Sequence, residues 1–167
     1  MDNRDWLAER FESHRPVERT PIAARQLASR ARRRVRRATA SSDVDVTRQR
    51  TVVDAFLAAS RAGDFDALLA VLDPDVVVRA DSGPDRPATS GEVRGARAVA
   101  EQALMFRRIA PSARRVLVNG TAGLVAYTGE RPYAVLGFTI RRGRIVEIDI
   151  LADPERLGRL DLPSLDA

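Results

Sequence analysis

The stretch TVVDAFLAASRAGDFDALLAVLDPDVVVRAD, residues 51–81, predicts two helices followed by a strand. At helical spacing, the first helix carries an apolar face made by Val52, Val53, Phe56 and Leu57. Gly63 suits the left-handed C-terminal cap of this helix, and Asp64 suits the N-cap of the next one. Because a proline disfavours helix in the residue before it, Asp73-Pro-Asp75 is expected to end the second helix, and Val76 begins the strand.

The segment after this strand predicts a loop, a third helix and a run of hairpins. Residues 80–91 contain two glycines and two prolines and are expected to form an irregular loop. A helix is expected to open at Gly95 and to end before Pro111, with its inward side made by Val99, Ala103 and Phe106. From Arg114 the apolar residues alternate, which predicts four strands joined by turns at Asn119-Gly120, Gly129-Glu130 and Arg142-Gly143. The prediction is an α+β cone, with three helices packed on a curved mixed or antiparallel sheet.

This order of elements resembles a SnoaL-like domain, the cone-shaped fold that is also found in nuclear transport factor 2. It is most similar to the C-terminal SnoaL-like domain of extracytoplasmic-function sigma factors of the sigma-70 family. Asp81 and Gly83 match an Asp-Gly-Gly-Gly-type loop of those domains, whereas Ser82 and Pro84 depart from it. Residues 153–157, DPERL, resemble their closing Asn-Pro-Asp-Lys-Leu-type motif.

The resemblance implies that such a domain controls the activity of the attached sigma regions. The contact residues that it implies are Asp81, Gly83, Asp153, Pro154, Glu155, Arg156 and Leu157.

The charge of the chain is concentrated in its N-terminal part. Residues 1–50 hold 13 Arg and 7 acidic residues, a net of +6, whereas residues 51–167 hold 15 Arg and 16 acidic residues, a net of −1. Residues 19–38 are predicted to form a helix, and they hold eight arginines with no acidic residue among them. A one-sided basic helix is typical of a nucleic-acid binder, although a solvated helix without a partner would show the same pattern.

Two N-terminal segments resemble parts of the same sigma factors. Residues 1–17, with Trp6, Leu7 and Phe11 at helical spacing, are similar to the first helix of the core-polymerase-binding region. Residues 19–38 are similar to the recognition helix that reads the promoter −35 element. On that resemblance, the bases would be contacted by Arg25, Gln26, Ser29 and Arg30, and the phosphates by Arg32, Arg33, Arg36 and Arg37.

The chain as a whole therefore resembles an internally truncated extracytoplasmic-function sigma factor. Residues 39–46 are interpreted as a linker, in which Asp45 or the adjoining Thr47 caps the next helix, and residues 47–160 as the SnoaL-like domain. The absence of cysteine suits a reducing cytoplasm, and no apolar run is long enough to span a membrane. The N-terminus has no apolar segment typical of a secretory signal. No metal site and no cofactor motif is predicted.

An enzymatic function is the main alternative. Acid–base catalysis needs a group that titrates near the operating pH, and the only histidine, His14, lies outside the cone. The residues expected in the pocket are Arg79, Asp81, Tyr127 and Asp149, of which Asp149, Asp81 and Tyr127 are the catalytic candidates for a small isomerase, cyclase or hydrolase.

Asp149 is expected to share a strand face with Glu147 and Ile145, opposite Val146, Ile148 and Ile150. The alternation alone does not decide which of these faces looks into the cone, and a surface or hydrogen-bonded carboxylate is the simpler interpretation of Asp149.

The favoured hypothesis is a regulatory protein derived from a sigma factor. Its SnoaL-like domain would be a non-catalytic interaction or ligand-sensing module, and its Arg-rich helix would bind DNA weakly. The partners expected are RNA polymerase or sigma-factor regions, DNA without sequence specificity, and a small apolar ligand. No membrane partner is expected, and a homodimer through the sheet stays open.

Overall fold

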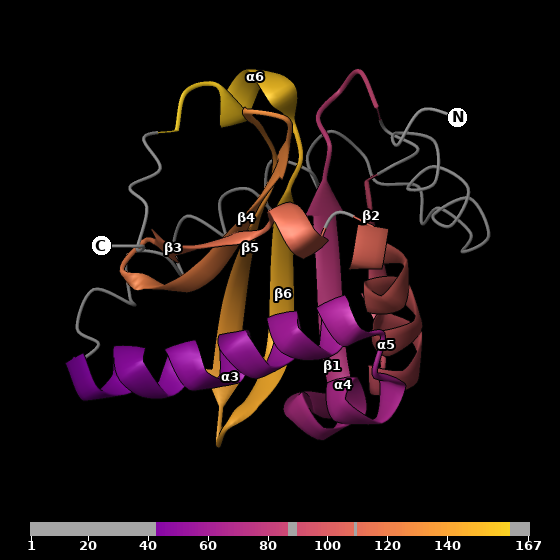
Figure 1. The fold of residues 1–167 in the computed structure, drawn as a ribbon. Coiled ribbons are helices and arrows are strands. Elements are labelled where there is room, and N and C mark those ends of the chain that lie inside the picture. The colour runs from indigo at the N-terminus through magenta and orange to yellow at the C-terminus, as the bar shows by residue number, and fades with distance from the viewer. Residues whose placement is uncertain (1–42, 87–89, 109, 161–167) are drawn as a thin grey trace.

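The computed structural model describes residues 43–86, 90–108 and 110–160 (Figure 1). Its α-helices are α3 (Asp43–Ala62), α4 (Phe65–Val71), α5 (Ala96–Met105) and the single turn α6 (Pro154–Leu157), with 3₁₀ turns η2 (Phe106–Arg108) and η3 (Ala110–Ser112). The strands are β1 (Leu72–Asp81), β2 (Gly91–Arg94), β3 (Arg114–Val118), β4 (Thr121–Thr128), β5 (Arg131–Arg141) and β6 (Arg144–Leu151). The predicted segments 1–17 and 19–38 lie outside the described residues.

The predicted helical pair is present, with the predicted caps. Gly63 has a φ of 72°, and the N–H of Asp64 donates to the carbonyl of Ala59 at 3.0 Å, which closes the end of α3. The Asp64 carboxylate then accepts a hydrogen bond from the N–H of Ala67 at 2.9 Å, which caps α4. The two helices therefore meet at the turn that the sequence indicated.

The strands form one six-stranded mixed sheet in the order β2-β1-β6-β5-β4-β3. The C-terminal hairpin run β3 to β6 is antiparallel as predicted, and positive φ angles at Asn119, Gly120, Arg142 and Gly143 suit its tight turns. Strand β1 joins this run by pairing parallel to β6. Figure 1 shows α3 crossing one face of the curved sheet, with α4 and α5 beside β1.

Three predicted boundaries need correction. Helix α3 begins at Asp43, so residues 43–46 belong to a helix and not to the expected linker. Strand β1 begins at Leu72, ahead of the expected Val76, because Pro74 falls within a register shift against β6, where a missing N–H is tolerated.

The third correction is β2, which lies at the end of the expected loop. Its four residues hold a single buried apolar side chain, Val93, so the sequence carries little strand signal there. Strand β2 forms because Val93 and Glu92 pair with Val78 and Arg79 of β1.

The main hydrophobic core lies between the helices and one face of the sheet, called here the inner face. Phe56 of α3 and Phe138 of β5 meet edge to face across it, with ring centroids 5.4 Å apart. A smaller cluster occupies the other, outer face and is made by Val116, Val125, Val135 and Leu157. Both sides of the sheet thus contain buried apolar residues, but the helices α3 and α5 contribute only to the inner core.

Candidate functional site

An apolar cavity lies between the inner face of the sheet and the helices. The cavity has a volume of about 40 Å³. This is more than the roughly 10–15 Å³ that one water molecule needs. Phe56 of α3 forms one wall of the cavity. The face of α5 and η2 forms another, made by Val99, Gln102, Ala103 and Phe106, which follow helical spacing.

The sheet wall of the cavity is built by alternation along β1 and β6. Val78 and Ala80 point inward from β1, and Ile148 and Ile150 point inward from β6. Leu136 of β5 completes this wall. Beyond the strand ends, Ser82 and Ala152 continue the same lining.

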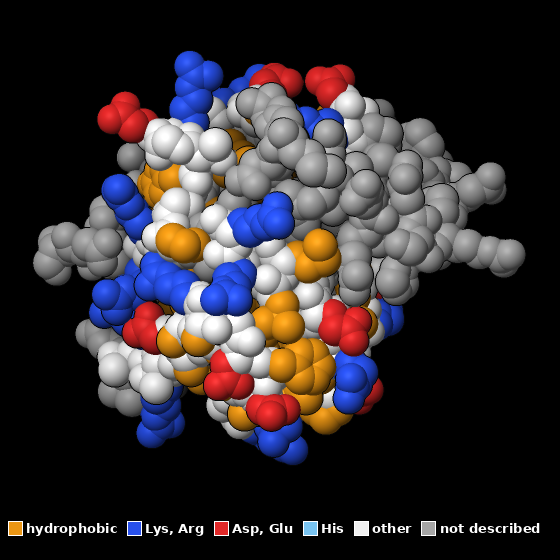
Figure 2. All heavy atoms as spheres, turned by 45° about the vertical axis from the view of Figure 1, so that its right-hand side comes forward, with side chains coloured by type: hydrophobic (Ala, Val, Ile, Leu, Met, Phe, Trp, Pro, Cys, Tyr) orange, Lys and Arg blue, Asp and Glu red, His pale blue; other side chains and the backbone are white. Residues whose placement is uncertain are grey.

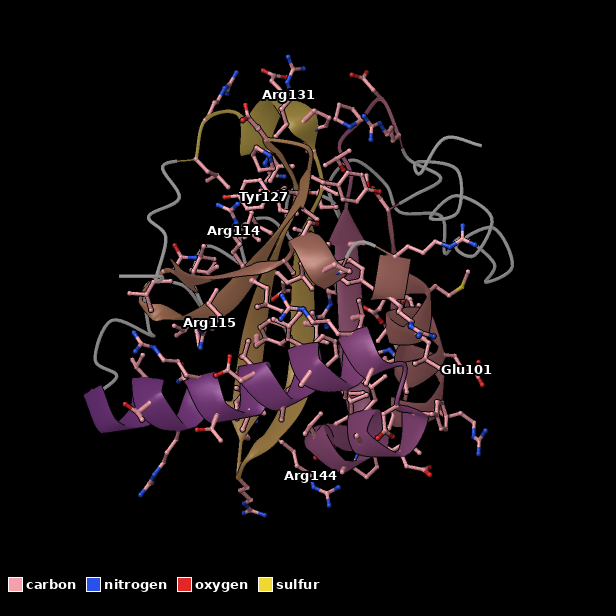
Figure 3. All side chains as sticks on the ribbon, in the orientation of Figure 1. Glu101, Arg114, Arg115, Tyr127, Arg131 and Arg144 are labelled. Atoms are coloured by element: carbon pink, nitrogen blue, oxygen red, sulfur yellow. The ribbon has the colours of Figure 1, made fainter. Side chains whose placement is uncertain are left out.

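The alternation also decides which residues stay out of the cavity. Arg79, Asp81 and Asp149 occupy the intervening positions on β1 and β6, and none of them is a lining residue. Tyr127 packs with the outer cluster, and Arg114 lies over its ring at 5.0 Å (Figure 3). None of these four predicted residues is therefore among those that line this cavity, because they lie on or beside the outer face.

The expectation that Ile145, Glu147 and Asp149 share one face of β6 is not met at Ile145. Ile145 is fully buried in the main core with Ile148, whereas Glu147 lies on the outer face. The cause is an irregularity in the pairing of β5 with β6, where Ile140 opposes Ile145 and Thr139 opposes Glu147. This bulge inserts an extra residue and reverses the facing of Ile145.

Arg79 belongs to an ion-pair network on the outer face of β1, β2 and β6. Its guanidinium lies 3.0 Å from Glu92 and also contacts the Glu147 carboxylate. Glu92 pairs in turn with Arg94 at 2.6 Å. Glu147 is buried, with 8% of its surface exposed, so the network satisfies a carboxylate that burial would otherwise destabilise.

These positions bear on catalysis. Of the described residues that line the cavity, Tyr133 alone has a side chain that titrates in water, and none has a carboxylate. An acid–base mechanism that uses Asp149, Asp81 or Tyr127 inside the cone lacks support from this geometry, because those side chains do not reach the cavity.

Gln102 is a cavity residue that is absent from the sequence-based candidates. Its side-chain oxygen is buried at the cavity and has no hydrogen-bond partner among the described residues. The signal was available, because Gln102 lies three residues after Val99 and four before Phe106, which places it on the same helical face.

The two segments expected to form a contact surface lie against each other at one end of the sheet. The Asp81 carboxylate pairs with Arg156 at 2.5 Å, and the Asp81 carbonyl accepts from the N–H of Ala152 at 2.8 Å. Asp81 also accepts from the N–H of Gly83 at 3.1 Å. We call Asp81, Gly83 and residues 153–157 the loop–turn surface.

Close packing holds this surface together. Gly83 has a φ of 84°, and a Cβ placed on it would lie 2.8 Å from Cγ of Asp153. Asp153 is buried and caps α6 through the N–H of Glu155 at 3.0 Å, while Leu157 is buried in the outer cluster. The exposed part of the turn is therefore Pro154, Glu155 and Arg156.

The expected DNA-binding residues, which run from Arg25 to Arg37, lie outside the described residues. On the face of the molecule shown in Figure 2, arginine, acidic and hydrophobic side chains are interspersed. Within residues 43–86, 90–108 and 110–160, no helix is long and apolar enough to cross a membrane. No cluster of three His, Cys, Asp or Glu side chains suited to a metal ion occurs in those ranges.

Residues 53–148 match the SnoaL-like domain family, and they make up more than half of the chain. The chain therefore belongs to the SnoaL-like domain family, and the predicted cone fold is confirmed. A de novo designed protein with a curved β-sheet shares the fold alone, with a TM-score of 0.50 at 18% identity over 69% of this chain and 90% of that one.

The predicted resemblance to sigma factors is also confirmed. The chain is 36% identical over 148 residues to the ECF RNA polymerase sigma factor SigJ of Mycobacterium tuberculosis H37Rv, covering 80% of this chain and 47% of SigJ. It is 31% identical over 147 residues to the probable ECF RNA polymerase sigma factor SigI of the CDC 1551 strain, covering 81% and 46%. The crystal structure of the M. tuberculosis extracytoplasmic function sigma factor SigJ matches with a TM-score of 0.57 and 29% identity, covering 88% of this chain and 54% of that one. The chain spans about half the length of the curated relatives it matches.

Proposed function

We propose that this chain is a sigma-factor-related regulator of bacterial transcription that works in the cytoplasm. Its SnoaL-like domain binds sigma-factor or RNA polymerase segments through the loop–turn surface and does so without catalysis. The observation that carries the proposal is the meeting of Asp81 with Arg156, two residues that belong to separate sigma-like motifs. The similarity to SigJ and SigI supports a role in transcription.

The form of the loop–turn surface supports binding to a partner. Pro154, Glu155 and Arg156 are exposed, whereas the groups beneath them are held by an N-cap, a backbone hydrogen bond and the tight contact at Gly83. A surface of this kind loses little conformational entropy when a partner binds. A rigid exposed turn therefore suits recognition of another protein better than an unconstrained loop would.

The test is capture of purified core RNA polymerase and of an intact extracytoplasmic-function sigma factor by the tagged full chain. Arg156→Glu places a second negative charge beside Asp81, and we expect it to reduce capture by about tenfold or more, because charge complementarity at an interface is lost. Arg115→Glu is the matched control, since Arg115 pairs with Asp54 and the side chains of Arg115 and Arg156 are 50% and 48% exposed. Equal loss in both variants, or no capture by the unaltered chain, would contradict the proposal.

A second proposed activity is weak DNA binding by the Arg-rich segment 19–38. Eight arginines without an intervening acidic residue support it. We expect the full chain to bind duplex DNA in fluorescence anisotropy with an affinity that falls steeply as salt rises. Alanine substitutions of Arg32, Arg33 and Arg36 are expected to flatten the salt dependence, whereas the same changes at the exposed Arg141, Arg142 and Arg144 serve as the control. A salt dependence that is unaffected by the first set would contradict DNA binding by this segment.

A further inference from the structure

Gln102 places a hydrogen-bond acceptor in an otherwise apolar cavity. Its Oε1 is shielded from solvent and has no partner among the described residues. A buried acceptor without a donor is unfavourable, because it has lost its hydrogen bond to water and gained none in return. An apolar side chain at this position would avoid that loss, so the site is better suited to receiving a donor from a bound molecule.

The cavity restricts what that molecule can be. Its walls are formed mainly by aliphatic and aromatic residues, and none of the residues lining it is Asp, Glu, Lys, Arg or His. A charged ligand would have no opposite charge to offset its loss of hydration. The fitting ligand is small, neutral and largely apolar, with a hydroxyl or amide N–H that donates to Gln102.

The lining residues alternate in sequence with residues of the loop–turn surface. Ala80 and Ser82 face the cavity, whereas Asp81 between them pairs with Arg156. Directly after β6, Ala152 lines the cavity and is followed by Asp153, the N-cap of α6. One backbone segment at the end of each strand therefore connects the cavity to the loop–turn surface, and a shift of either segment on ligand binding would change the cavity and the surface together.

We propose that the cavity binds a small neutral apolar molecule that donates one hydrogen bond to Oε1 of Gln102, and that its binding changes the loop–turn surface. The first part stands independently. The second part deepens the proposed function and rests on it.

The binding test titrates the full chain with three probes of similar shape, and NMR measures the binding of each probe. Cyclohexanol offers a donor, cyclohexanone only an acceptor, and methylcyclohexane neither. We expect cyclohexanol to bind about tenfold more tightly than cyclohexanone, because both carry one polar oxygen and cyclohexanol alone supplies the missing donor. Methylcyclohexane has no polar group to desolvate, so it reports on apolar binding alone. The expected signals are shifts of the Ser82 and Ala152 amides, which line the cavity.

Gln102→Leu is the matched variant, since it keeps the approximate size of the side chain and removes the acceptor. We expect this variant to lose the preference for cyclohexanol while still binding methylcyclohexane. Equal affinity for cyclohexanol and cyclohexanone in the unaltered chain, tighter binding of cyclohexanone, or no binding of cyclohexanol at its solubility limit would overturn the ligand assignment. The comparison among probes in the unaltered chain needs no variant, so it stands even if Gln102→Leu fails to fold.

The coupling test repeats the polymerase and sigma-factor capture with saturating cyclohexanol. A change in capture of about threefold or more, with shifts of the Gly83 and Arg156 amides, is the expected result. Binding of cyclohexanol without either effect would overturn the coupling and leave the ligand assignment standing. Equal loss of capture in Arg156→Glu and Arg115→Glu would instead overturn the proposed function. The probe affinities would still report on the cavity in that case.

Discussion

Strands β1 and β6 carry apolar side chains on the face toward the helices and charged side chains on the other face. On the inner face, Val78 and Ile148 line the cavity. On the outer face, Arg79 pairs with Glu92 and Glu147. The residues that look chemically active in the sequence therefore stabilise the sheet, and the candidate ligand site is made of residues that look like ordinary core.

The inner face should be the more sensitive to loss of volume. Ile148→Ala removes a side chain that is 2% exposed, and we expect the free energy of unfolding to fall by about 2–5 kcal/mol. Val146→Ala on the same strand is the control, because Val146 is only partly buried and should cost less. Urea denaturation measures both, and equal losses would remove the distinction between the two positions.

The contact between Gly83 and Asp153 is expected to give the next largest effect. Gly83→Ala forces a Cβ into a left-handed residue and against the Asp153 carboxylate, and we expect a cost of about 2–4 kcal/mol. Gly120→Ala, at a similar φ of 80° but with nothing within 4 Å of the new Cβ, should cost only about 1–2 kcal/mol. Thermal unfolding of the two variants isolates the contact, and identical losses would show that it is not tight.

The outer network should give a smaller effect. Glu147→Gln removes one of the two carboxylates that face Arg79, and we expect a loss of about 1–3 kcal/mol, moderated because Glu92 remains. A double-mutant cycle with Arg79→Gln measures the coupling. A coupling near zero would mean that the network does not stabilise the pairing of β1 with β6.

The smallest effect is expected at an exposed ion pair. Asp54→Asn breaks a 3.3 Å contact with Arg115, and both side chains are about half exposed, so stability should change by about 1 kcal/mol or less. Chemical denaturation at low and high salt checks this, since screening should reduce even that difference. A larger loss than in Glu147→Gln would reverse the order expected between exposed and buried pairs.

Much of the fold could be predicted because its signals are local. The caps at Gly63 and Asp64 and the turns at Asn119-Gly120 and Arg142-Gly143 each depend on a few neighbouring residues. The loop at Asp81 and the turn at residues 153–157 were also identified in the sequence, through resemblance to sigma-associated motifs. Their direct contact through Arg156 was not, because the parallel pairing of β1 with β6 brings them together.

The candidate site was predicted less well. Asp149 is a candidate in the sequence because it lies between Ile148 and Ile150, but the side of the sheet on which it lies depends on which face the helices cover. Ile145 was placed with Glu147 because strict alternation ignores a bulge. Gln102 gives no clear signal in the sequence beyond its helical spacing, because a glutamine on a helix is usually exposed and only the packing of α5 against the sheet buries its oxygen.

The sequence by itself determined the helical pair, the hairpin run, the concentration of positive charge in residues 1–50 and the resemblance to sigma-associated SnoaL-like domains. Each of these depends on residues close together in the chain or on motifs that can be compared directly. Only the tertiary structure decided the short strand β2, the parallel pairing of β1 with β6 and the residues that line the cavity. Those features depend on contacts between residues far apart in the sequence, and local propensity does not encode which face of a strand such contacts will bury.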